Sequence, residues 1–359
     1  MKTYQTITTF LLAIALLSTS ACDEENERST DVKTLRILAV QAETPFAKPG
    51  VQVPMHMLAH DGSASATLKD GSRRPVELVW IGGCVNPAGD SYTMCLPFLH
   101  EVVKQAGNVF ETQQVPEGTP GDILGWGTDF TAEVPQDIIS SRAVADGVVN
   151  PYGLQFIFVA ACAGHLRPIA DAKIEDFPLG CFDDNGTALG RDDFDLGYYP
   201  LYVYDNVTNT NPQIQGMVFN GTPAGDPCAE SKPCPAGQKC GSEAVCIPVV
   251  SSCGKSDADD CDEYPVALGV PESVVELGVL ARVSASDAKP ESVWVNYYAY
   301  GGSFKNGSSM INDANSGWTG DFNGKWRADV PSGTQSRIWA VVRDNRNGVT
   351  WRYQDIWVQ

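Results

Sequence analysis

The pattern of cysteines constrains the fold of this chain more than any other feature. The sequence of 359 residues contains eleven cysteines. The first follows an N-terminal apolar stretch, and the other ten fall in close pairs or in one dense cluster. An even number of closely spaced cysteines is typical of proteins that fold in an oxidising compartment, so up to five disulfides are expected. The cysteines expected in disulfides are Cys84, Cys95, Cys162, Cys181, Cys228, Cys234, Cys240, Cys246, Cys253 and Cys261.

The N-terminal residues predict export. Lys2 precedes an apolar run from Phe10 to Leu17, and four small residues then lead to Cys22. A basic start, a short apolar run and a small-residue cleavage site form a secretory signal peptide. A membrane-spanning helix needs about 20 apolar residues, and this run is much shorter. The signal peptide is therefore expected to span residues 1–21.

The sequence Ser-Thr-Ser-Ala-Cys at residues 18–22 resembles the lipobox of bacterial lipoproteins, although Thr19 stands where that family usually has an aliphatic residue. The resemblance implies a diacylglycerol on Cys22, a polar tether over residues 22–33 and a place in the cell envelope. Asp23 leaves the choice of membrane open, with the outer membrane or cell surface favoured over the inner membrane. The alternative is ordinary cleavage near Ala21, with Cys22 free or in a disulfide.

Composition narrows the class of protein and of partner. The formal net charge of −19 should repel nucleic acid, so no nucleic-acid partner is expected. Contact with the membrane is expected only through the lipid on Cys22. Glycine and proline are plentiful, and strand-like runs recur between turn signals, which predicts a mainly β protein of about two domains.

Residues 34–206 predict an immunoglobulin-like β-sandwich. Residues 51–57 alternate apolar and other side chains, Trp80 lies on a second alternating run, and Leu154 to Ala161 is a nearly continuous apolar run. Such patterns are typical of half-buried and fully buried sandwich strands. The stretch of about 96–150 is predicted to be a partly helical insertion, with helices expected at Leu99 to Gln105 and Gln136 to Ala145. Because long insertions often carry function, it is a first candidate for a binding surface.

Residues 207–359 predict a second immunoglobulin-like sandwich with a disulfide-rich insert at about 226–262. Its first strand is expected near 211–221 and the next only at Val274 to Val283. The segment 292–304 resembles the Trp-bearing third strand of bacterial immunoglobulin-like or PKD-like domains, and residues 338–353 form a final hairpin with an Asn-Gly turn. The whole chain resembles uncharacterised myxobacterial-type surface lipoproteins. This resemblance implies a fold and a location but no activity.

The cysteine spacing favours local pairing. Cys84 is expected to pair with Cys95, and Cys162 with Cys181, across turn-rich loops. The six cysteines of the insert allow 15 pairings, of which 228–240, 234–246 and 253–261 are favoured. The alternative is a zinc site, but the spacings are too wide for paired Cys-x-x-Cys ligands and the segment has no histidine.

Chemistry-bearing motifs are sparse. The chain has four histidines. Two of them, His56 and His60, stand four residues apart on a predicted strand, too far apart to share one ion. The sequence has no His-Glu-x-x-His, no Gly-x-Ser-x-Gly and no phosphate-binding glycine-rich loop, so no catalytic residue is assigned, and a Ser/His/Asp or carboxylate-pair site assembled in three dimensions is the open alternative. Hard oxygen ligands grouped on a flexible loop suit Ca²⁺, which is the one cofactor considered, and the alternative is a solvated surface loop. The candidate ligands are Asp183, Asp184, Asn185, Asp192, Asp193 and Asp195.

Tryptophans suggest a glycan-binding hypothesis. Three tryptophans lie in glycine-rich segments, where exposed rings would stack on sugars: Trp126, Trp318 and Trp326. Four others lie in strand patterns and are expected mostly in cores: Trp80, Trp294, Trp339 and Trp351.

The leading hypothesis is a noncatalytic, lipid-anchored envelope protein that displays two sandwiches for structural or adhesive contacts with an unknown envelope protein or glycan. A glycan-binding or Ca²⁺-dependent adhesion module is the alternative, and an extracytoplasmic enzyme comes third.

Overall fold

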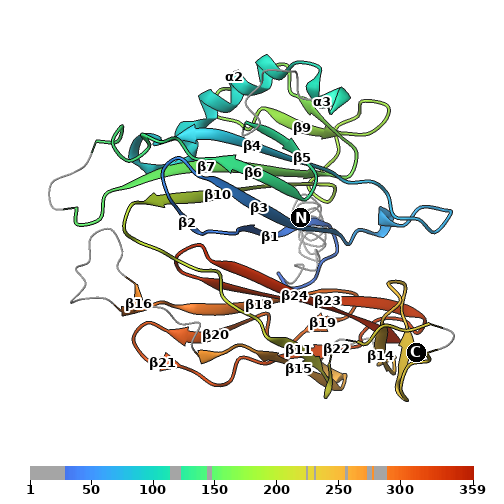
Figure 1. The fold of residues 1–359 in the computed structure, drawn as a ribbon. Coiled ribbons are helices and arrows are strands. Elements are labelled where there is room, and N and C mark those ends of the chain that lie inside the picture. Colours follow the sequence, from blue (N-terminus) through green and yellow to red (C-terminus); the bar gives the residue numbers. More distant parts are fainter. Residues whose placement is uncertain are drawn as a thin grey trace, which may run out of the picture.

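The structure is a computed structural model that describes residues 29–113, 123–143, 148–223, 225–229, 232–254, 258–272, 277–278 and 289–359. The expected signal peptide and Cys22 lie outside the described residues. The fold is mainly β and consists of two sandwiches stacked face to face, with helices α2 and α3 covering the far face of the first (Figure 1). Among the helices described, none has the length and apolar character needed to cross a membrane.

The first sandwich has the strand order of an immunoglobulin domain. Its smaller sheet has the order β1–β3–β6 and its larger sheet the order β2–β10–β7–β4–β5. In the usual lettering of immunoglobulin strands along the chain, the smaller sheet is A–B–E and the larger sheet is A′–G–F–C–C′. The short strand β2 pairs in parallel with β10. A small hairpin, β8–β9, joins β7 to β10. The bounds are β1 (Leu35–Ala42), β2 (Phe46–Ala47), β3 (Gln52–Asp61), β4 (Glu77–Val85), β5 (Leu124–Trp126), β6 (Asp129–Glu133), β7 (Tyr152–Cys162), β8 (His165–Pro168), β9 (Leu179–Phe182) and β10 (Phe194–Tyr204).

Two apolar layers explain why β7 is buried along almost its whole length. On one face, the inward residues Val53, Met55 and Met57 of β3 pack with Trp80 and Ile157. On the other face, the helices α2 (Leu96–Ala106) and α3 (Val109–Thr112) pack over β4 and β7. A strand covered on both faces reads as a continuous apolar run rather than an alternating one, as the sequence of β7 does.

The second sandwich repeats this topology. One sheet has the order β12–β11–β15–β22–β19 and the other β13–β14–β24–β23–β18–β20–β21, with β14 parallel to β24. The bounds are β11 (Gly216–Phe219), β12 (Thr222–Pro223), β13 (Gln238–Cys240), β14 (Cys246–Val250), β15 (Glu263–Gly269), β16 (Leu277–Gly278), β17 (Lys289–Pro290), β18 (Val293–Tyr300), β19 (Ser303–Phe304), β20 (Ser308–Asp313), β21 (Gly317–Trp318), β22 (Gly324–Arg327), β23 (Thr334–Asp344) and β24 (Val349–Val358). Single 3-10 turns span Ala64–Ala66, Ala88–Asp90, Tyr92–Cys95 and Ala258–Asp260.

Several boundaries differ from the sequence prediction. Within 96–150 the helix near 99–105 is confirmed, but β5 and β6 are strands of the sandwich itself. Residues 136–141, expected to be helical, form turns. In the second sandwich the strand that follows the cysteine-rich insert and pairs with β11 is β15. It comes earlier than the expected 274–283, a range of which the structure describes only Leu277–Gly278. The prediction missed β15 because it follows directly on the cysteine-rich insert.

The five disulfides join the pairs that the spacing favoured. The structure pairs Cys84 with Cys95 and Cys162 with Cys181 in the first sandwich. In the insert it pairs 228 with 240, 234 with 246 and 253 with 261. Because β13 and β14 form only a three-residue ladder, this short hairpin depends on its crosslinks more than on a core of its own. Such a set of disulfides indicates an extracytoplasmic protein.

The outer faces of the two sandwiches form a closed junction. Leu38 and Leu58 of the β1–β3 sheet pack with Trp339 and Tyr298 of the β18–β23–β24 sheet. Polar contacts frame this apolar patch: Arg343 Nη2 donates to the Leu38 carbonyl at 2.5 Å. Figure 1 shows β1 and β3 lying directly over β23 and β24. The junction therefore brings together residues more than 300 positions apart.

Candidate ligand-binding groove

A cavity of about 270 Å³ opens where the two sandwiches meet. Figure 1 shows the β23–β24 turn reaching the end of the first sandwich at which β2 lies. Four aromatic rings of the first sandwich line one wall, and three residues of the β23–β24 turn line the other. The lining residues are Phe46, Tyr152, Tyr202 and Tyr204 on the first wall and Asn345, Arg346 and Asn347 on the second. We call this cavity the junction groove.

Strand alternation places the tyrosines on one face. On β10, Leu201 and Val203 point into the core against β3, so Tyr202 and Tyr204 project from the opposite face. Tyr152, the first residue of β7, stands directly opposite Tyr204 in the ladder. Ring centroids lie 5.6 Å apart between Tyr152 and Tyr204, and 5.7 Å apart between Tyr152 and Tyr202. Because these residues lie at the end of the sheet, their rings are left facing the groove.

An ion pair fixes the outer tyrosine. The Tyr152 hydroxyl donates to Asp90 Oδ2 at 2.6 Å, and Arg142 Nη2 donates to Asp90 Oδ1 at 2.5 Å. The Arg142 guanidinium also lies 4.1 Å from the centre of the Tyr152 ring, a cation–π contact. This triad holds one edge of the groove rigid and compensates the charge of Asp90.

Tyr202 and Tyr204 lack the hydrogen bonds that hold Tyr152 in place. Tyr204 is 4% exposed, and neither its hydroxyl nor that of Tyr202 has a hydrogen-bond partner among the described residues. Burial, then the neighbouring Tyr202, raises the pKa of Tyr204, and burial together with Asp90 raises the pKa of Tyr202. Both hydroxyls therefore keep their protons at neutral pH and can donate as well as accept a hydrogen bond.

The second wall is a rigid turn. The Asp344 carboxylate accepts hydrogen bonds from the backbone N–H groups of Arg346 and Gly348, each at 2.7 Å. Asn347 Nδ2 donates to the Pro200 carbonyl at 2.8 Å, and the Tyr199 hydroxyl donates to the Asn347 carbonyl at 2.9 Å. These bonds tie the turn of the second sandwich to β10 of the first, so the groove exists only in the docked arrangement.

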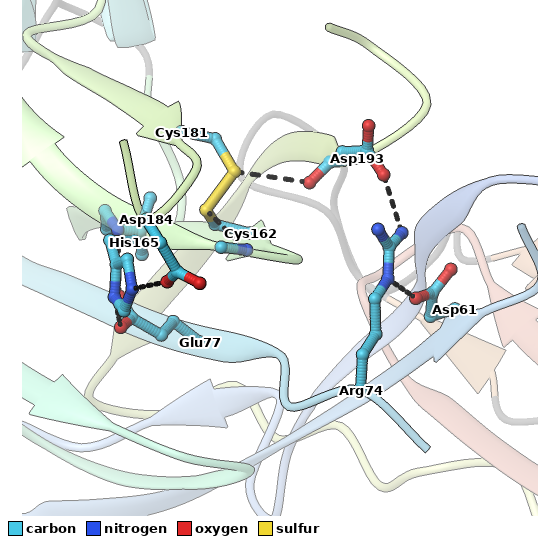
Figure 2. The surroundings of a disulfide bond; sticks show 10 residues. Asp61, Arg74, Glu77, Cys162, His165, Cys181, Asp184 and Asp193 are labelled. Carbon is cyan, nitrogen blue, oxygen red and sulfur yellow. Dashed lines mark hydrogen bonds and ion pairs between the residues drawn. A yellow bond between two sulfur atoms is a disulfide. The ribbon is translucent and has the colours of Figure 1, made fainter. Parts of the chain in front are cut away.

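The acidic loop proposed to bind Ca²⁺ has its carboxylates turned to different partners (Figure 2). Asp184 accepts from His165 Nε2 at 2.9 Å, while Glu77 contacts the other ring nitrogen at 3.0 Å. Asp193 pairs with Arg74 at 2.6 Å, beside the Cys162–Cys181 disulfide. These contacts brace the β8–β9 hairpin and the start of β10 against the rest of the sandwich.

The remaining members of that set are also dispersed. Asp183 Oδ1 accepts from the backbone N–H groups of Asn185 and Thr187, and Asp195 Oδ2 accepts from Ile37 N at 2.7 Å. Asp192 contributes its carbonyl to Leu35 N. Within the described ranges, the one group of three candidate ligands within reach of a common ion is Cys228, Cys234 and Cys246. Those sulfurs are in disulfides. Ca²⁺ binding stays a prediction that this geometry does not favour.

Each of the four histidines has a place in the fold. His56 Nδ1 contacts Asp129 at 2.7 Å, His100 Nε2 contacts the Asp176 carbonyl at 3.0 Å, and His165 bridges Glu77 and Asp184. Hydrogen bonds that the His165 ring donates to Asp184 and Glu77 raise its pKa. The fourth, His60, lies in the junction, and burial lowers its pKa to about 4. The four side chains do not converge on one site.

The tryptophans chosen for glycan stacking do not form an exposed surface. Trp326 is fully buried in the core of the second sandwich, and Trp126 and Trp318 pack half-buried against the two cores. Trp294, expected in a core, points outward because Val293 and Val295 take the inward phase of β18. The useful signal was the alternation Tyr202-Val-Tyr204 in a predicted strand, which places two aromatic rings on one face.

The comparisons with known proteins give no family. No known protein family and no curated protein matches this chain. Among 46 matching chains of solved structures is the dimeric latent PorU of Porphyromonas gingivalis, at 10% identity and a TM-score of 0.19. That match covers 91% of this chain and only 24% of PorU, so this chain spans about a quarter of its length.

Two further matches are equally remote. The three N-terminal domains of the bacteriophage RB49 highly immunogenic outer capsid protein (Hoc) match at 8% identity and a TM-score of 0.17, with 91% of this chain and 70% of that chain covered. Extracellular domains 3–5 of Drosophila OTK match at 8% identity and a TM-score of 0.15, with 91% of this chain and 97% of that chain covered. The similarity is weak throughout. The immunoglobulin-like assignment therefore depends on the strand order described above.

Proposed function

We propose that this chain is a noncatalytic, lipid-anchored protein of the cell envelope that displays two docked immunoglobulin-like sandwiches for adhesive or structural contacts. The observation that carries the proposal is the junction. Two disulfide-braced sandwiches dock through a buried apolar patch and form an open groove from both partners, as expected of a rigid display unit. Binding sites commonly lie at such boundaries between domains.

The ionisable side chains favour binding over catalysis. His56, His100 and His165 are engaged in contacts that hold strands and loops together, and His60 is packed against Tyr300 and Trp339 in the junction. Arg74 likewise bridges Asp61 and Asp193, at 2.5 and 2.6 Å. A general base must be free to reach a substrate proton, whereas these groups are paired with elements of the fold or, like His60, packed in the junction.

The anchor is proposed from the lipobox-like residues ending at Cys22. Two or more acyl chains give stable attachment, while one chain gives only marginal attachment. We expect intact-mass spectrometry to find acyl chains on Cys22, and Cys22→Ser to move the protein from the membrane fraction to the soluble fraction. Non-reducing peptide mapping should find the five disulfides in both forms. An unmodified Cys22, or unchanged fractionation of the variant, would refute the anchor.

The binding role is tested separately. A fluorescently labelled fragment of residues 23–359 should bind isolated cell envelopes in a saturable manner, with excess unlabelled fragment displacing it. The matched control is the same fragment after reduction and alkylation of its disulfides, which should not compete. Only nonsaturable binding, or equal competition by the reduced fragment, would contradict an adhesive role for the folded sandwiches.

A further inference from the structure

We propose that the junction groove binds a short neutral glycan, of one or two pyranose rings. This inference depends on the proposed binding role and names the ligand class for it. Three properties of the groove lead to this ligand: its size, its tyrosine hydroxyl groups and its lack of an unpaired positive charge among the described residues.

The size of the groove suits a small ligand. Pockets for small molecules begin at about 300 Å³ and are lined mainly by apolar and aromatic side chains with a few polar groups. The groove has about 270 Å³ and this kind of lining. A folded protein partner would instead need about 800 Å² of contact on each side. Tyr152 and Tyr202, the two partly exposed rings of the aromatic wall, are the ones that an apolar C–H face of a sugar can contact.

The tyrosine hydroxyl groups give the groove donors and acceptors for a ligand. Tyr204 is almost fully buried and lines the groove, yet its hydroxyl has no partner among the described residues. Neither this hydroxyl nor that of Tyr202 is among the buried side-chain atoms that lack a partner in the described part of the chain, so both face the solvent of the groove, where a ligand hydroxyl can replace water. A sugar hydroxyl both donates and accepts, so it can satisfy Tyr204 and Tyr202 together.

Both positive side chains beside the groove are paired with carboxylates. Asp90 pairs with Arg142, and Arg346 lies 3.1 Å from Glu291 in an ion pair whose two side chains are 3% and 2% exposed. The Asp344 carboxylate in the same turn as Arg346 adds one negative charge, so the described residues of the groove present no unpaired positive charge to a phosphate or a carboxylate, and the chain's charge of −19 opposes polyanions. A neutral saccharide fits this balance better than a charged one.

The rival ligand for an aromatic groove is a proline-rich peptide, which docks in an extended conformation along exposed rings. Phe46 and Tyr204 are only 3% and 4% exposed, so their rings form the base of a pocket rather than an exposed track. The observations therefore favour the saccharide, and the peptide serves as a competing probe.

The test is ligand-observed NMR and calorimetry on residues 23–359 with maltotriose, cellotriose and tri-N-acetylchitotriose. At least one should bind, at a Kd of about 0.1–10 mM. Tyr204→Phe and Tyr202→Phe keep the ring and remove only the hydroxyl, so each should weaken binding about threefold to tenfold, as loss of one hydrogen bond does. Tyr92→Phe, at an exposed tyrosine outside the groove, is the matched control and should bind as the wild type does. Melting curves verify that each variant folds.

Three results would overturn the inference: no binding of any of the three saccharides, saccharide binding that both groove variants leave unchanged, or tight binding of a proline decapeptide that the groove variants abolish. If the saccharides fail while the labelled fragment still binds envelopes saturably, the ligand assignment falls and the adhesive role remains. If the fragment fails to bind envelopes while a saccharide binds in the groove, the adhesive role falls and the ligand assignment remains.

Discussion

His60 makes the junction between the sandwiches sensitive to acid. Its ring lies 4.7 Å from that of Trp339 and 5.0 Å from that of Tyr300, measured between centroids. Its Nε2 atom is buried without a hydrogen-bond partner among the described residues. Burial is the main cause that lowers its pKa to about 4, the positive charges of Arg73 and Arg337 add to it, and Asp61 opposes it. A protonated His60 would therefore hold an unpaired charge in the junction.

The size of the effect follows from linkage. In the unfolded chain His60 takes up its proton near its ordinary pKa of 6.5, whereas in the folded chain it does so near 4. Between these values the unfolded state binds more protons, so the free energy of unfolding falls as the pH falls. The loss attributable to His60 should be about 1.4 kcal/mol at pH 5.5 and about 2.5 kcal/mol at pH 4.5, levelling off below pH 4. Above pH 6.5 its contribution is constant.

The assay is urea unfolding of the wild type and of His60→Phe, from pH 7.5 to 4.5. Phenylalanine keeps an aromatic ring between Trp339 and Tyr300 but cannot titrate. Carboxylates titrate in both proteins, so the difference between the two pH profiles isolates His60. We expect the wild type to lose about 2.5 kcal/mol more than the variant over this range. Parallel profiles would refute the reasoning, as would an NMR titration that places the His60 ring near pKa 6.5.

Two further predictions concern local packing and crosslinks. Gly302 has a φ of +77°, and a Cβ there would lie 2.3 Å from the Trp326 ring, whereas Gly320 has a φ of +72° and open space. Thermal unfolding should show Gly302→Ala to be the more destabilising by at least about 1 kcal/mol, because both variants carry backbone strain but only one overpacks the core. Equal melting points for the two would contradict the close approach of Gly302 to Trp326. Replacing Cys162 and Cys181 together by serine should lower the free energy of unfolding by about 3 kcal/mol, the loop-closure value for their separation of 19 residues; denaturant curves unchanged from the wild type would contradict this.

The features predictable from sequence were those set over short distances along the chain. Alternation with a period of two identified β3, and the continuous apolar run identified β7, because each pattern records the burial of its own strand. The disulfides were predictable for the same reason, since every partner lies within 19 residues of the other. Alternation alone did not say which phase faces inward, so Trp294 was placed in a core that Tyr297 occupies.

The junction groove was not predictable, because no local pattern contains it. Its walls come from β2, β7 and β10 of one sandwich and from a turn near residue 346 of the other. Only the docking of outer sheet faces brings these segments together. In the sequence, a strand with an apolar outer face has the same pattern as any other half-buried strand.

The acidic loop posed the opposite problem. Its carboxylates are close in sequence, yet they found separate partners in basic side chains and backbone groups, such as Arg74 for Asp193.

The start of the folded chain relates the groove to the proposed anchor. Val32 N donates to the Ala299 carbonyl and Ala299 N to the Thr30 carbonyl, both at 2.8 Å, so residues expected in the tether are held against the end of β18. The reach from Cys22 to Ser29 is then at most about 25 Å. At the other end of β18, Asn345 N donates to the Ser292 carbonyl at 3.0 Å, beside the groove. About seven residues of strand, roughly 23 Å, therefore separate the anchored end from the groove. In the proposed anchored state, the groove therefore lies at the end of β18 opposite the tether, at a distance close to the full reach of residues 22–29.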